Sequence, residues 1–437
     1  MKTSFKRILA IFLSACMMLS LVSCGEEAEV DYLTELTDQS LTYTLDELYD
    51  LETETLYAAD YELPALYKYF EGLCNIGVAF TSDQIVDLED DITKSILKHY
   101  RVYTLGNELK PDHVNPSEGE YNFDDADAFV EFGQLTDATL RGHTLVWHSQ
   151  VPDWWFKADP TDESSLEDCY ANGTLATSDQ LIERMTEYIT TVVSRYADTI
   201  DIWDVCNEVL NDSGTGVRGI NDSSYWSYII GDLDGDGYSD DYIQLAFEAA
   251  RAANEDAVLM INDYNMEWSS AKCQQMYNLV VRMFEKGVRI DGVGFQSHIE
   301  LDCDVETYRE NLELIASLSD LYDEYFPEYA GNFRITITEL DMDMFIGSNS
   351  DGGYYIWSDE EYEQQAEKYA ELIDMFLDFA DEGIIDTIIF WGTDDENSWL
   401  NSTPKIRRNA SLLFDRGLSV KPCFYSIAEA ALNHSSN

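Results

Sequence analysis

Eight short apolar segments alternate with longer amphipathic stretches, and this alternation constrains the fold more than any other feature of the chain. The segments are rich in Val, Ile and aromatic residues: NIGVAF (75–80), RVYTLGN (101–107), TLRGHTLVW (139–147), DIWDVCNE (201–208), AVLMINDYN (257–265), GVGFQSHIE (292–300), FRITITELD (333–341) and TIIFWGTDD (387–395). Apolar runs separated by helical patterns indicate parallel strands joined by crossover helices. Repeated eight times, the pattern predicts an α/β fold, a single (β/α)8 TIM barrel.

Two of the intervening stretches carry a helix-start signal. Thr177 is followed three residues later by Gln180, and Ser358 is followed at the same spacing by Glu361. This spacing is typical of a capping box, in which the two side chains satisfy backbone amides at the first turn. Apolar residues then recur at helical spacing on one face. We therefore expect long amphipathic helices to begin at both positions.

Most of the predicted strands end in polar or aromatic residues. The endings are Asn107, Trp147-His148, Asn207-Glu208, Asp263-Tyr264-Asn265, Gln296 with His298, Glu339, and Trp391. A single ending of this kind is usually a cap or a satisfied polar group. In a TIM barrel, however, all strand carboxyl ends reach the same face. Their convergence there predicts a binding or catalytic cleft.

Two carboxylates stand out among these endings. Glu208 ends the fourth predicted strand and Glu339 the seventh, so they are expected on opposing sides of the barrel mouth. Glycoside hydrolysis requires such a pair. Three histidines on the strand ends raise the alternative of zinc. His143 and His148 are five positions apart, and on a continuous strand their rings would face opposite sides, which disfavours a metal site.

From about residue 63 to about residue 432, the chain resembles glycoside hydrolase family 10, the endo-β-1,4-xylanases. The motifs that carry the resemblance are GNELKP (106–111), RGHTLVWHSQVPDWW (141–155), WDVCNE (203–208), NDYN (262–265), GVGFQSH (292–298), ITELD (337–341), FWGTDDENSW (390–399), LLFD (412–415) and KP (421–422). The resemblance implies retaining endo-hydrolysis of β-1,4-xylosidic linkages in xylan, with no required cofactor.

The resemblance also implies a role for each matching residue. Glu339 would be the nucleophile and Glu208 the general acid/base, with their carboxyl groups roughly 5–5.5 Å apart. Asn207 would hold the 2-hydroxyl of the attacked sugar. The other expected substrate-site contacts are Lys110 and His143 on the same sugar, Asn107 and Gln150 on the next sugar outward, His298 against Glu339, Gln296 near the acid/base, Trp147, Trp391 and Trp399 around the cleft, and Tyr264 on the leaving-group side.

Gly106 departs from the family pattern, because many members have Glu immediately before the first-motif Asn. One sugar contact in the outer glycone subsite is therefore expected to be missing, and we predict weaker binding there without loss of the chemistry.

An acidic insertion, GDLDGDGYSDD (231–241), follows the fourth predicted strand. Its Asp232, Asp234 and Asp236 match positions 1, 3 and 5 of a calcium loop, but position 12, normally a bidentate acidic residue, is Ile243. Two interpretations follow: a solvated acidic turn, which we favour, or a structural calcium site that stiffens a loop on the active-site face.

The start of the chain is typical of an export signal. A basic start precedes a short apolar run ending in Leu21-Val22-Ser23-Cys24, which is similar to a bacterial lipobox. We expect residues 1–23 to be a lipoprotein signal peptide, with Cys24 lipidated, 24–60 an acidic tether, 61–433 the catalytic domain and 434–437 a tail. The protein would be a bacterial cell-surface lipoprotein. The alternative is ordinary cleavage and secretion.

The formal net charge of −59 disfavours nucleic acid and anionic lipid as partners. Membrane contact is thus expected only through the lipid anchor, and we expect a monomer that acts on xylan or xylo-oligosaccharides. Two rival functions remain. One is a retaining β-1,4-glucanase on the same barrel, and the other is a surface lipoprotein that binds polysaccharide without cutting it.

Overall fold

The structure is a computed structural model that describes residues 49–50, 55–56, 64–346, 355–403 and 406–435. The predicted signal peptide, Cys24 and most of the predicted tether lie outside these residues. Within the tether range, β1 (Tyr49–Asp50) and β2 (Thr55–Leu56) form a short antiparallel pair.

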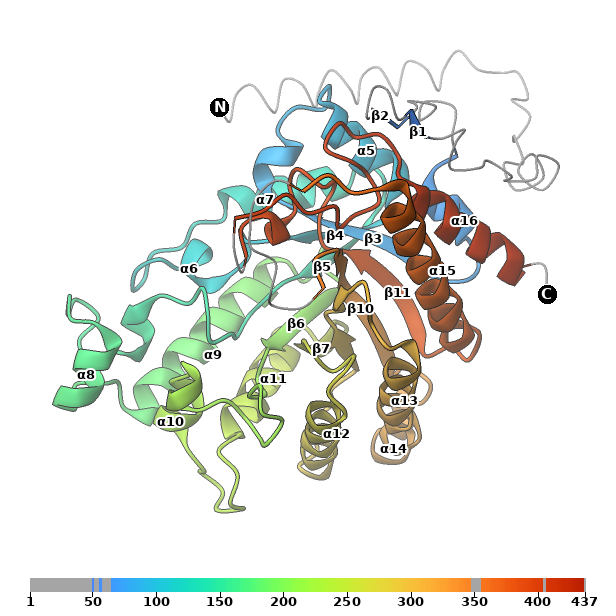
Figure 1. Ribbon diagram of the computed structural model, residues 1–437. Coiled ribbons are helices and arrows are strands. Elements are labelled where there is room, and N and C mark those ends of the chain that lie inside the picture. Colours follow the sequence, from blue (N-terminus) through green and yellow to red (C-terminus); the bar gives the residue numbers. More distant parts are fainter. Residues whose placement is uncertain (1–48, 51–54, 57–63, 347–354, 404–405, 436–437) are drawn as a thin grey trace, which may run out of the picture.

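Eight parallel strands close into a barrel at the centre of the molecule (Figure 1). They are β3 (Asn75–Phe80), β4 (Val102–Leu105), β5 (Thr139–Gly142), β6 (Ile202–Asn207), β7 (Val258–Asp263), β8 (Gly292–Phe295), β10 (Arg334–Asp343) and β11 (Ile385–Phe390). Each strand pairs with its neighbour in this order, and β11 closes the ring by pairing with both β10 and β3. The predicted TIM barrel is confirmed.

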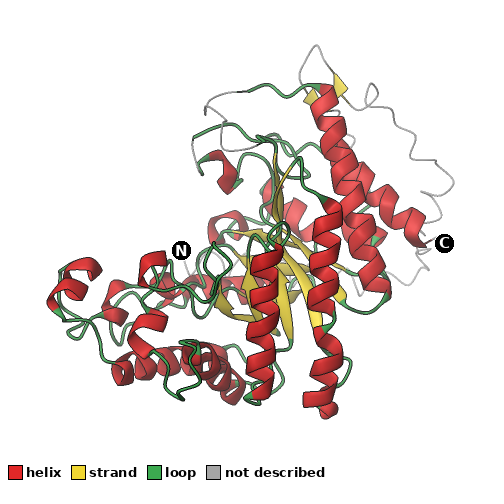
Figure 2. Ribbon diagram, turned by 60° about the horizontal axis from the view of Figure 1, so that its bottom comes forward, coloured by secondary structure: helices red, strands yellow, loops and turns green. Residues whose placement is uncertain are grey.

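Helices surround the barrel and cover its outer surface (Figure 2). The longer ones are α5 (Asp91–His99), α7 (Asp124–Gly133), α9 (Ser178–Arg195), α11 (Asp241–Ala253), α12 (Ser270–Glu285), α13 (Val305–Ala316), α14 (Leu318–Tyr325), α15 (Asp359–Asp381) and α16 (Pro422–Ser435). Shorter helices are α4 (Leu66–Tyr69), α6 (Pro111–Val114), α8 (Leu166–Asn172) and α10 (Trp226–Ile230). Single 3-10 turns occur at Ser82–Ile85, Asp153–Phe156, Ile220–Asp222, Pro327–Tyr329 and Trp399–Asn401.

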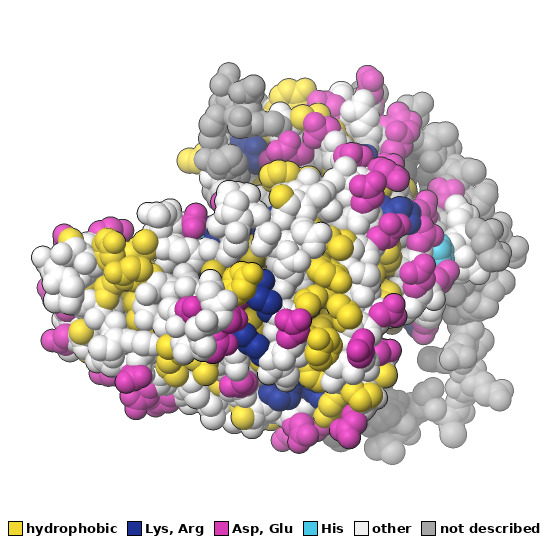
Figure 3. Space-filling model, turned by 90° about the horizontal axis from the view of Figure 1, so that it is seen from below, with side chains coloured by type: hydrophobic (Ala, Val, Ile, Leu, Met, Phe, Trp, Pro, Cys, Tyr) yellow, Lys and Arg dark blue, Asp and Glu magenta, His cyan; other side chains and the backbone are white. Residues whose placement is uncertain are grey.

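The two predicted helix starts are confirmed, because Thr177 and Ser358 both form capping boxes at the beginning of α9 and α15. Along the described part of the chain, no helix combines the length and apolarity needed to cross a bilayer. Seen from below, acidic side chains are spread over the surface and Lys and Arg form only small groups (Figure 3).

Two predicted strands end earlier than expected at the barrel rim. The run 139–147 is a strand only to Gly142, after which Val146 makes an isolated bridge to Cys206. The run 292–300 is divided into β8 and β9 (His298–Glu300), which pairs with the outer part of β10. His143 and His148 both lie outside the strands, so the prediction that they face opposite sides of one strand is wrong.

The core of the barrel wall depends on close packing at the fourth strand. Trp203 and Cys206 are fully buried, and Cys206 is a free thiol. A Cβ atom added to Gly142 would lie 2.2 Å from the Trp203 ring. Glycine is therefore required at the end of β5, where the next residue, His143, turns toward the barrel mouth.

Candidate active site

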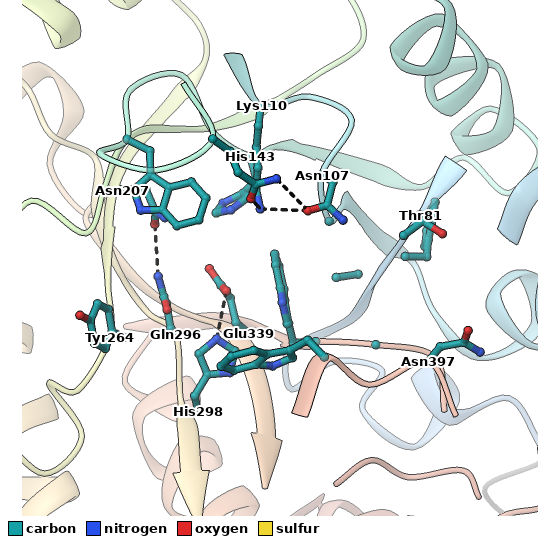
Figure 4. Close-up of a pocket in the computed structure, with 18 of the residues that line it drawn as sticks. Thr81, Asn107, Lys110, His143, Asn207, Tyr264, Gln296, His298, Glu339 and Asn397 are labelled. Atoms are coloured by element: carbon teal, nitrogen blue, oxygen red, sulfur yellow. Dashed lines mark hydrogen bonds and ion pairs between the residues drawn. The ribbon is translucent and has the colours of Figure 1, made fainter. Parts of the chain in front are cut away.

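A cavity of about 800 Å³ opens at the carboxyl ends of the barrel strands (Figure 4). The sequence-predicted catalytic and substrate-binding residues all line it: Asn107, Lys110, His143, Trp147, Gln150, Asn207, Glu208, Tyr264, Gln296, His298, Glu339, Trp391 and Trp399. Asn265, one of the predicted strand endings, lines it too, whereas sequence reasoning missed Thr81, Gln84, Thr393 and Asn397. A volume of this size falls within the usual range of small-molecule binding pockets.

Glu339 lies on β10 with a side chain only 5% exposed. One carboxylate oxygen accepts a hydrogen bond from Asn262 Nδ2 at 2.7 Å, and the other is 3.2 Å from His298 Nε2. Burial alone would raise the pKa of Glu339, but the hydrogen bond from His298 and the charges of His143 and His298 outweigh it and lower the pKa to about 2. Glu339 is therefore ionised at neutral pH.

His298 is held between two carboxylates. Its Nδ1 is 2.9 Å from Asp341 Oδ1, while its Nε2 faces Glu339. Burial would lower the pKa of His298, but the charges of Asp341 and Glu339 raise it well above 6.5. The imidazolium can then donate from both ring nitrogens. Asp341 also accepts a hydrogen bond from Trp399 Nε1 at 2.7 Å, and so fixes one wall of the cleft.

Glu208 has the opposite electrostatic environment. Its pKa is raised by burial and by the charge of Asp263, and the hydrogen bond from Gln296 opposes this shift only in part. Gln296 Nε2 donates to Glu208 Oε1 at 3.1 Å. The pKa values of the two glutamates are thus shifted in opposite directions, although both side chains line the same cleft.

The backbone at Glu208 places it beside Asn207 in the cleft. Adjacent residues of a regular strand point to opposite faces, yet both side chains line the cavity. β6 ends at Asn207, and Glu208 has a left-handed φ of 53°. This single departure from strand geometry brings the amide and the acid to the same face.

Three amide side chains connect the two glutamates. Asn262 Nδ2 donates to Asn207 Oδ1 at 2.8 Å as well as to Glu339. Gln296 Nε2 is 3.3 Å from Asn207 Oδ1, a contact that Figure 4 shows. Asn207 Oδ1 accepts from both neighbours, so its Nδ2 donors remain for other partners; the nearest is Glu208 Oε1 at 3.5 Å. The arrangement presents Asn207 to the cleft as a hydrogen-bond donor.

A second cluster of polar side chains lines the same cleft. Lys110 Nζ is 2.8 Å from Gln150 Oε1 and 3.4 Å from Asn107 Oδ1, and Gln150 Nε2 donates to Asn107 Oδ1 at 3.2 Å. Burial lowers the pKa of Lys110, against the charges of Glu339 and Glu208. These side chains offer several oriented donors and acceptors, which suits the hydroxyl groups of a sugar.

His143 is fixed from behind by a buried acid. Its Nδ1 lies 2.8 Å from Asp204 Oδ2, and Asp204 also pairs with the fully buried Arg141. Asp204 therefore supports both residues from inside the barrel. With Nδ1 engaged, the remaining ring nitrogen of His143 is the one available to the cleft.

Aromatic rings form the walls. Trp391 packs edge-on against His143, with ring centroids 5.3 Å apart, and Trp399 lies 4.9 Å from His298. Lys110 Nζ lies 4.7 Å from the Trp147 ring centroid. Tyr264 is fixed by hydrogen bonds of its hydroxyl with Asp212 and Arg218. Such rings can stack on the apolar faces of pyranose sugars.

The acidic insertion lies away from this cleft, and its expected position on the active-site face was wrong. None of residues 231–241 lines the cavity. The loop instead contacts Arg282 and Lys286 at the end of α12 that leads into the start of β8. Its anchor is therefore near the opposite end of the barrel.

Carboxylate oxygens of Asp232, Asp234 and Asp241 lie within 4.8 Å of one another, so the expected Asp232 and Asp234 do meet. Lys286 Nζ is 2.8 Å from Asp234, 3.0 Å from Asp236 and 3.1 Å from Asp241. Burial would lower the pKa of Lys286, but these hydrogen bonds raise it. The ammonium lies between the carboxylates that a calcium ion would need, which favours a closed acidic turn.

Comparisons with known proteins agree with the geometry. Residues 65–430 match the family model described as glycosyl hydrolase family 10. The chain is 38% identical over 399 residues to endo-1,4-beta-xylanase C of Paenibacillus barcinonensis, which covers 91% of this chain and 34% of that protein. It is 35% identical over 374 residues to exoglucanase XynX of Acetivibrio thermocellus, a match that covers 84% of this chain and 30% of that protein.

Among solved structures, a mutant intracellular xylanase of Thermoanaerobacterium saccharolyticum in complex with xylotriose has a TM-score of 0.69 and 34% identity. That match covers 84% of this chain and 98% of the solved chain. The chain spans about a third of the length of the first curated relatives it matches.

Proposed function

The chain belongs to glycosyl hydrolase family 10, and on this basis we propose that it is a retaining endo-β-1,4-xylanase, with Glu339 as nucleophile and Glu208 as general acid/base. The observation that carries the proposal is the opposite pKa shift of two carboxyl groups in one cleft. The pKa of Glu339 is lowered to about 2, and that of Glu208 is raised. Opposite shifts in a carboxyl pair assign the base and the acid of a glycosidase.

In the first step, the carboxylate of Glu339 attacks the anomeric carbon while Glu208 gives its proton to the departing glycosidic oxygen. The bond to the leaving group breaks, and an ester to Glu339 forms. The charge of Glu339 contributes to the raised pKa of Glu208. Esterification removes that charge, so the pKa of Glu208 falls, which suits its second role as base toward water.

Substrate recognition follows from the oriented side chains. Asn207 presents its Nδ2 donors and would hold the 2-hydroxyl of the attacked sugar, a contact that strengthens in the transition state. His143 and Lys110 would bind hydroxyls of the same sugar, and Asn107 with Gln150 those of the next. A tryptophan wall close to C5 would favour xylose, which lacks the hydroxymethyl group of glucose.

The relative with an exoglucanase name keeps a β-1,4-glucanase as a second candidate. Initial rates on xylan and on a soluble β-1,4-glucan separate the two, and we expect the xylan rate to be higher. Product analysis on substituted xylan should show short xylo-oligosaccharides released from internal positions. Faster hydrolysis of the glucan would refute the proposed substrate.

The non-catalytic alternative is tested with Glu339→Ala. The variant should bind xylan and release no reducing sugar, whereas the parent protein should release it. Binding without sugar release by both proteins would establish a binding protein instead.

We also propose that the protein is exported and anchored through a lipid on Cys24, as a monomer. Support comes from the basic start, the apolar run and the lipobox-like ending. Labelled palmitate should be incorporated by the full chain in a bacterial host and not by Cys24→Ser. Equal labelling of the two would refute the anchor, and light scattering on a form beginning at Gly25 should give the monomer mass.

A further inference from the structure

Glu267 is a buried carboxyl group that the proposed mechanism does not use. It lies in the loop between β7 and α12 and is 1% exposed. Its Oε1 accepts a hydrogen bond from the backbone N–H of Ser297 at 2.6 Å, whereas its Oε2 has no hydrogen-bond partner among the described residues. A buried acid with a single strong contact calls for a functional or structural reason.

The contact falls at the break between β8 and β9. Ser297 has a left-handed φ of 63°, so the regular ladder is interrupted and its N–H has no strand partner. Glu267 supplies the missing acceptor. On the other side, Ser297 Oγ lies 2.6 Å from Tyr308 Oη.

The two residues beside Ser297 contact the two proposed catalytic acids. Gln296 Nε2 donates to Glu208 at 3.1 Å, and His298 Nε2 is 3.2 Å from Glu339. The side chains of Gln296 and His298 therefore project from the two ends of one turn. A change in the φ of Ser297 would move both of them.

The loop that carries Glu267 is itself held in place. Asn311 Nδ2 donates to the carbonyl of Met266 at 2.8 Å and lies 3.4 Å from that of Glu267. Asn311 is fully enclosed on α13. The carboxylate thus projects from a fixed backbone, which a positioning role requires.

We propose that Glu267 is a positioning residue for both catalytic carboxylates: by accepting the hydrogen bond from Ser297 N, it fixes the turn that aims Gln296 at Glu208 and His298 at Glu339. This inference rests on the proposed glycosidase function. It assigns to one buried side chain the geometry of the two hydrogen bonds that reach the acids.

The surroundings of Glu267 allow a clean substitution. The charged groups that act on it are His298 and Lys272, and Tyr308, Cys273 and Cys303 are the other titratable groups it influences. Burial raises the pKa of Glu267 to about 7 despite its backbone hydrogen bonds. Gln, which resembles the protonated acid and keeps an acceptor oxygen, is thus a close replacement, whereas Leu removes the acceptor.

The experiment measures kcat/KM for p-nitrophenyl β-xylobioside against pH in the parent protein, Glu267→Leu and Glu267→Gln. If His298 no longer donates to Glu339, the pKa of Glu339 rises and the acid limb of the pH profile moves to higher pH. If Gln296 no longer donates to Glu208, the pKa of Glu208 rises and the basic limb moves to higher pH. We expect both limbs of Glu267→Leu to move to higher pH by about one unit. At the parent optimum, kcat/KM should fall on the order of 10²-fold. Glu267→Gln should restore both limbs.

Asp291→Asn is the matched control, because Asp291 is also buried and accepts a backbone hydrogen bond, from Leu259 N, at the opposite end of β8. It should lower the denaturation midpoint and leave both limbs in place. If Glu267→Leu does not fold, Glu267→Asp, which keeps the charge but withdraws the acceptor by one methylene, makes the same test.

Unmoved limbs in a folded Glu267→Leu or Glu267→Asp would overturn the proposal, and so would a Gln variant that shifts as far as Leu, since charge alone would then be responsible. A parent protein that does not cleave the xylobioside would instead refute the proposed function.

Discussion

Introducing a carboxylate at Gly106 should strengthen the outer glycone subsite. Gly106 follows β4 and lines the cleft, and its N–H donates to Phe80 O at 2.9 Å. A Cβ atom at this position would meet only that carbonyl oxygen, at 3.7 Å, an ordinary van der Waals contact. Its φ lies outside the left-handed range. Gly106→Glu should therefore fold without strain.

The gain in binding free energy at the outer glycone subsite can be estimated from the local contacts. A hydrogen bond between a carboxylate and a sugar hydroxyl contributes about 1.5–3 kcal/mol, while ordering a glutamate side chain costs up to about 2 kcal/mol. Lys110 lies three residues beyond Asn107 and attracts the new charge, whereas Glu108, whose Oε2 is 3.3 Å from Asn107 N, repels it. A net gain of about 1 kcal/mol, or about fivefold in affinity, is expected.

The assay compares kcat/KM for aryl β-xyloside and aryl β-xylobioside. Only the second substrate fills the outer glycone subsite, so Gly106→Glu should raise its kcat/KM about fivefold and leave the xyloside unchanged. Gly106→Ala adds the Cβ atom without the carboxylate and serves as control. The reasoning fails if the glutamate adds nothing on the xylobioside, or if the alanine variant gains as much.

The remaining predictions concern charge and stability. Since Glu339 stays ionised down to its pKa of about 2 and Glu208 has a raised pKa, the acid limb of kcat/KM should lie below the ordinary glutamate pKa of about 4.3. The stability that the ionised Glu339 contributes should be lost progressively in acid denaturation, as pH falls from about 4.3 to about 2. An acid limb at or above about 4.3 would contradict both expectations. Asp204→Leu leaves the fully buried Arg141 unpaired and should cost about 3–5 kcal/mol in urea denaturation; a loss under about 1 kcal/mol would mean that the pair is not structural. Lys286→Met should bind calcium more tightly than the parent in calorimetry, because the competing ammonium is gone, and equal heats would show that the loop is no cation site.

The barrel could be predicted from the sequence because each strand is a short apolar run and each crossover has helical periodicity. Strand ends could not be predicted as well. The runs at 139–147 and 292–300 continue with apolar or aromatic residues beyond the points where the ladder stops. What stops it is local backbone geometry, such as the left-handed φ of Ser297, and no residue type at these positions requires that geometry.

Residues of the site that lie at strand ends could be predicted from the sequence. The residues that form hydrogen bonds to them could be predicted less well. Asn262, Asp341 and Glu267 hold Glu339, His298 and Ser297, but each reads in the sequence as one more polar residue near a strand end. Their partners lie on other strands, and the register between strands decides which pairs meet. The register of the β6–β7 pairing, for example, shifts between Asp204 and Cys206, and no sequence pattern in either strand predicts this shift.

Backbone strain is concentrated where these supports are densest. In the described part of the chain, seven non-glycine residues have a left-handed φ, and four of them, Gln150, Glu208, Asn265 and Ser297, line the cleft or connect residues that do. Each costs roughly 1–2 kcal/mol relative to an ordinary conformation, so each persists only where other contacts fix it. Glu208 N donates to Asn262 O at 2.8 Å, and Ser297 N donates to Glu267 at 2.6 Å.

Neither strained residue aims its neighbours unaided. The hydrogen bonds that hold the backbone at Glu208 and Ser297 fix the side chains that contact the two glutamates. Relaxing either turn would therefore cost catalysis before it cost the fold, because the barrel strands below the rim keep their own ladder. This order of loss is what distinguishes a positioning contact from a structural one.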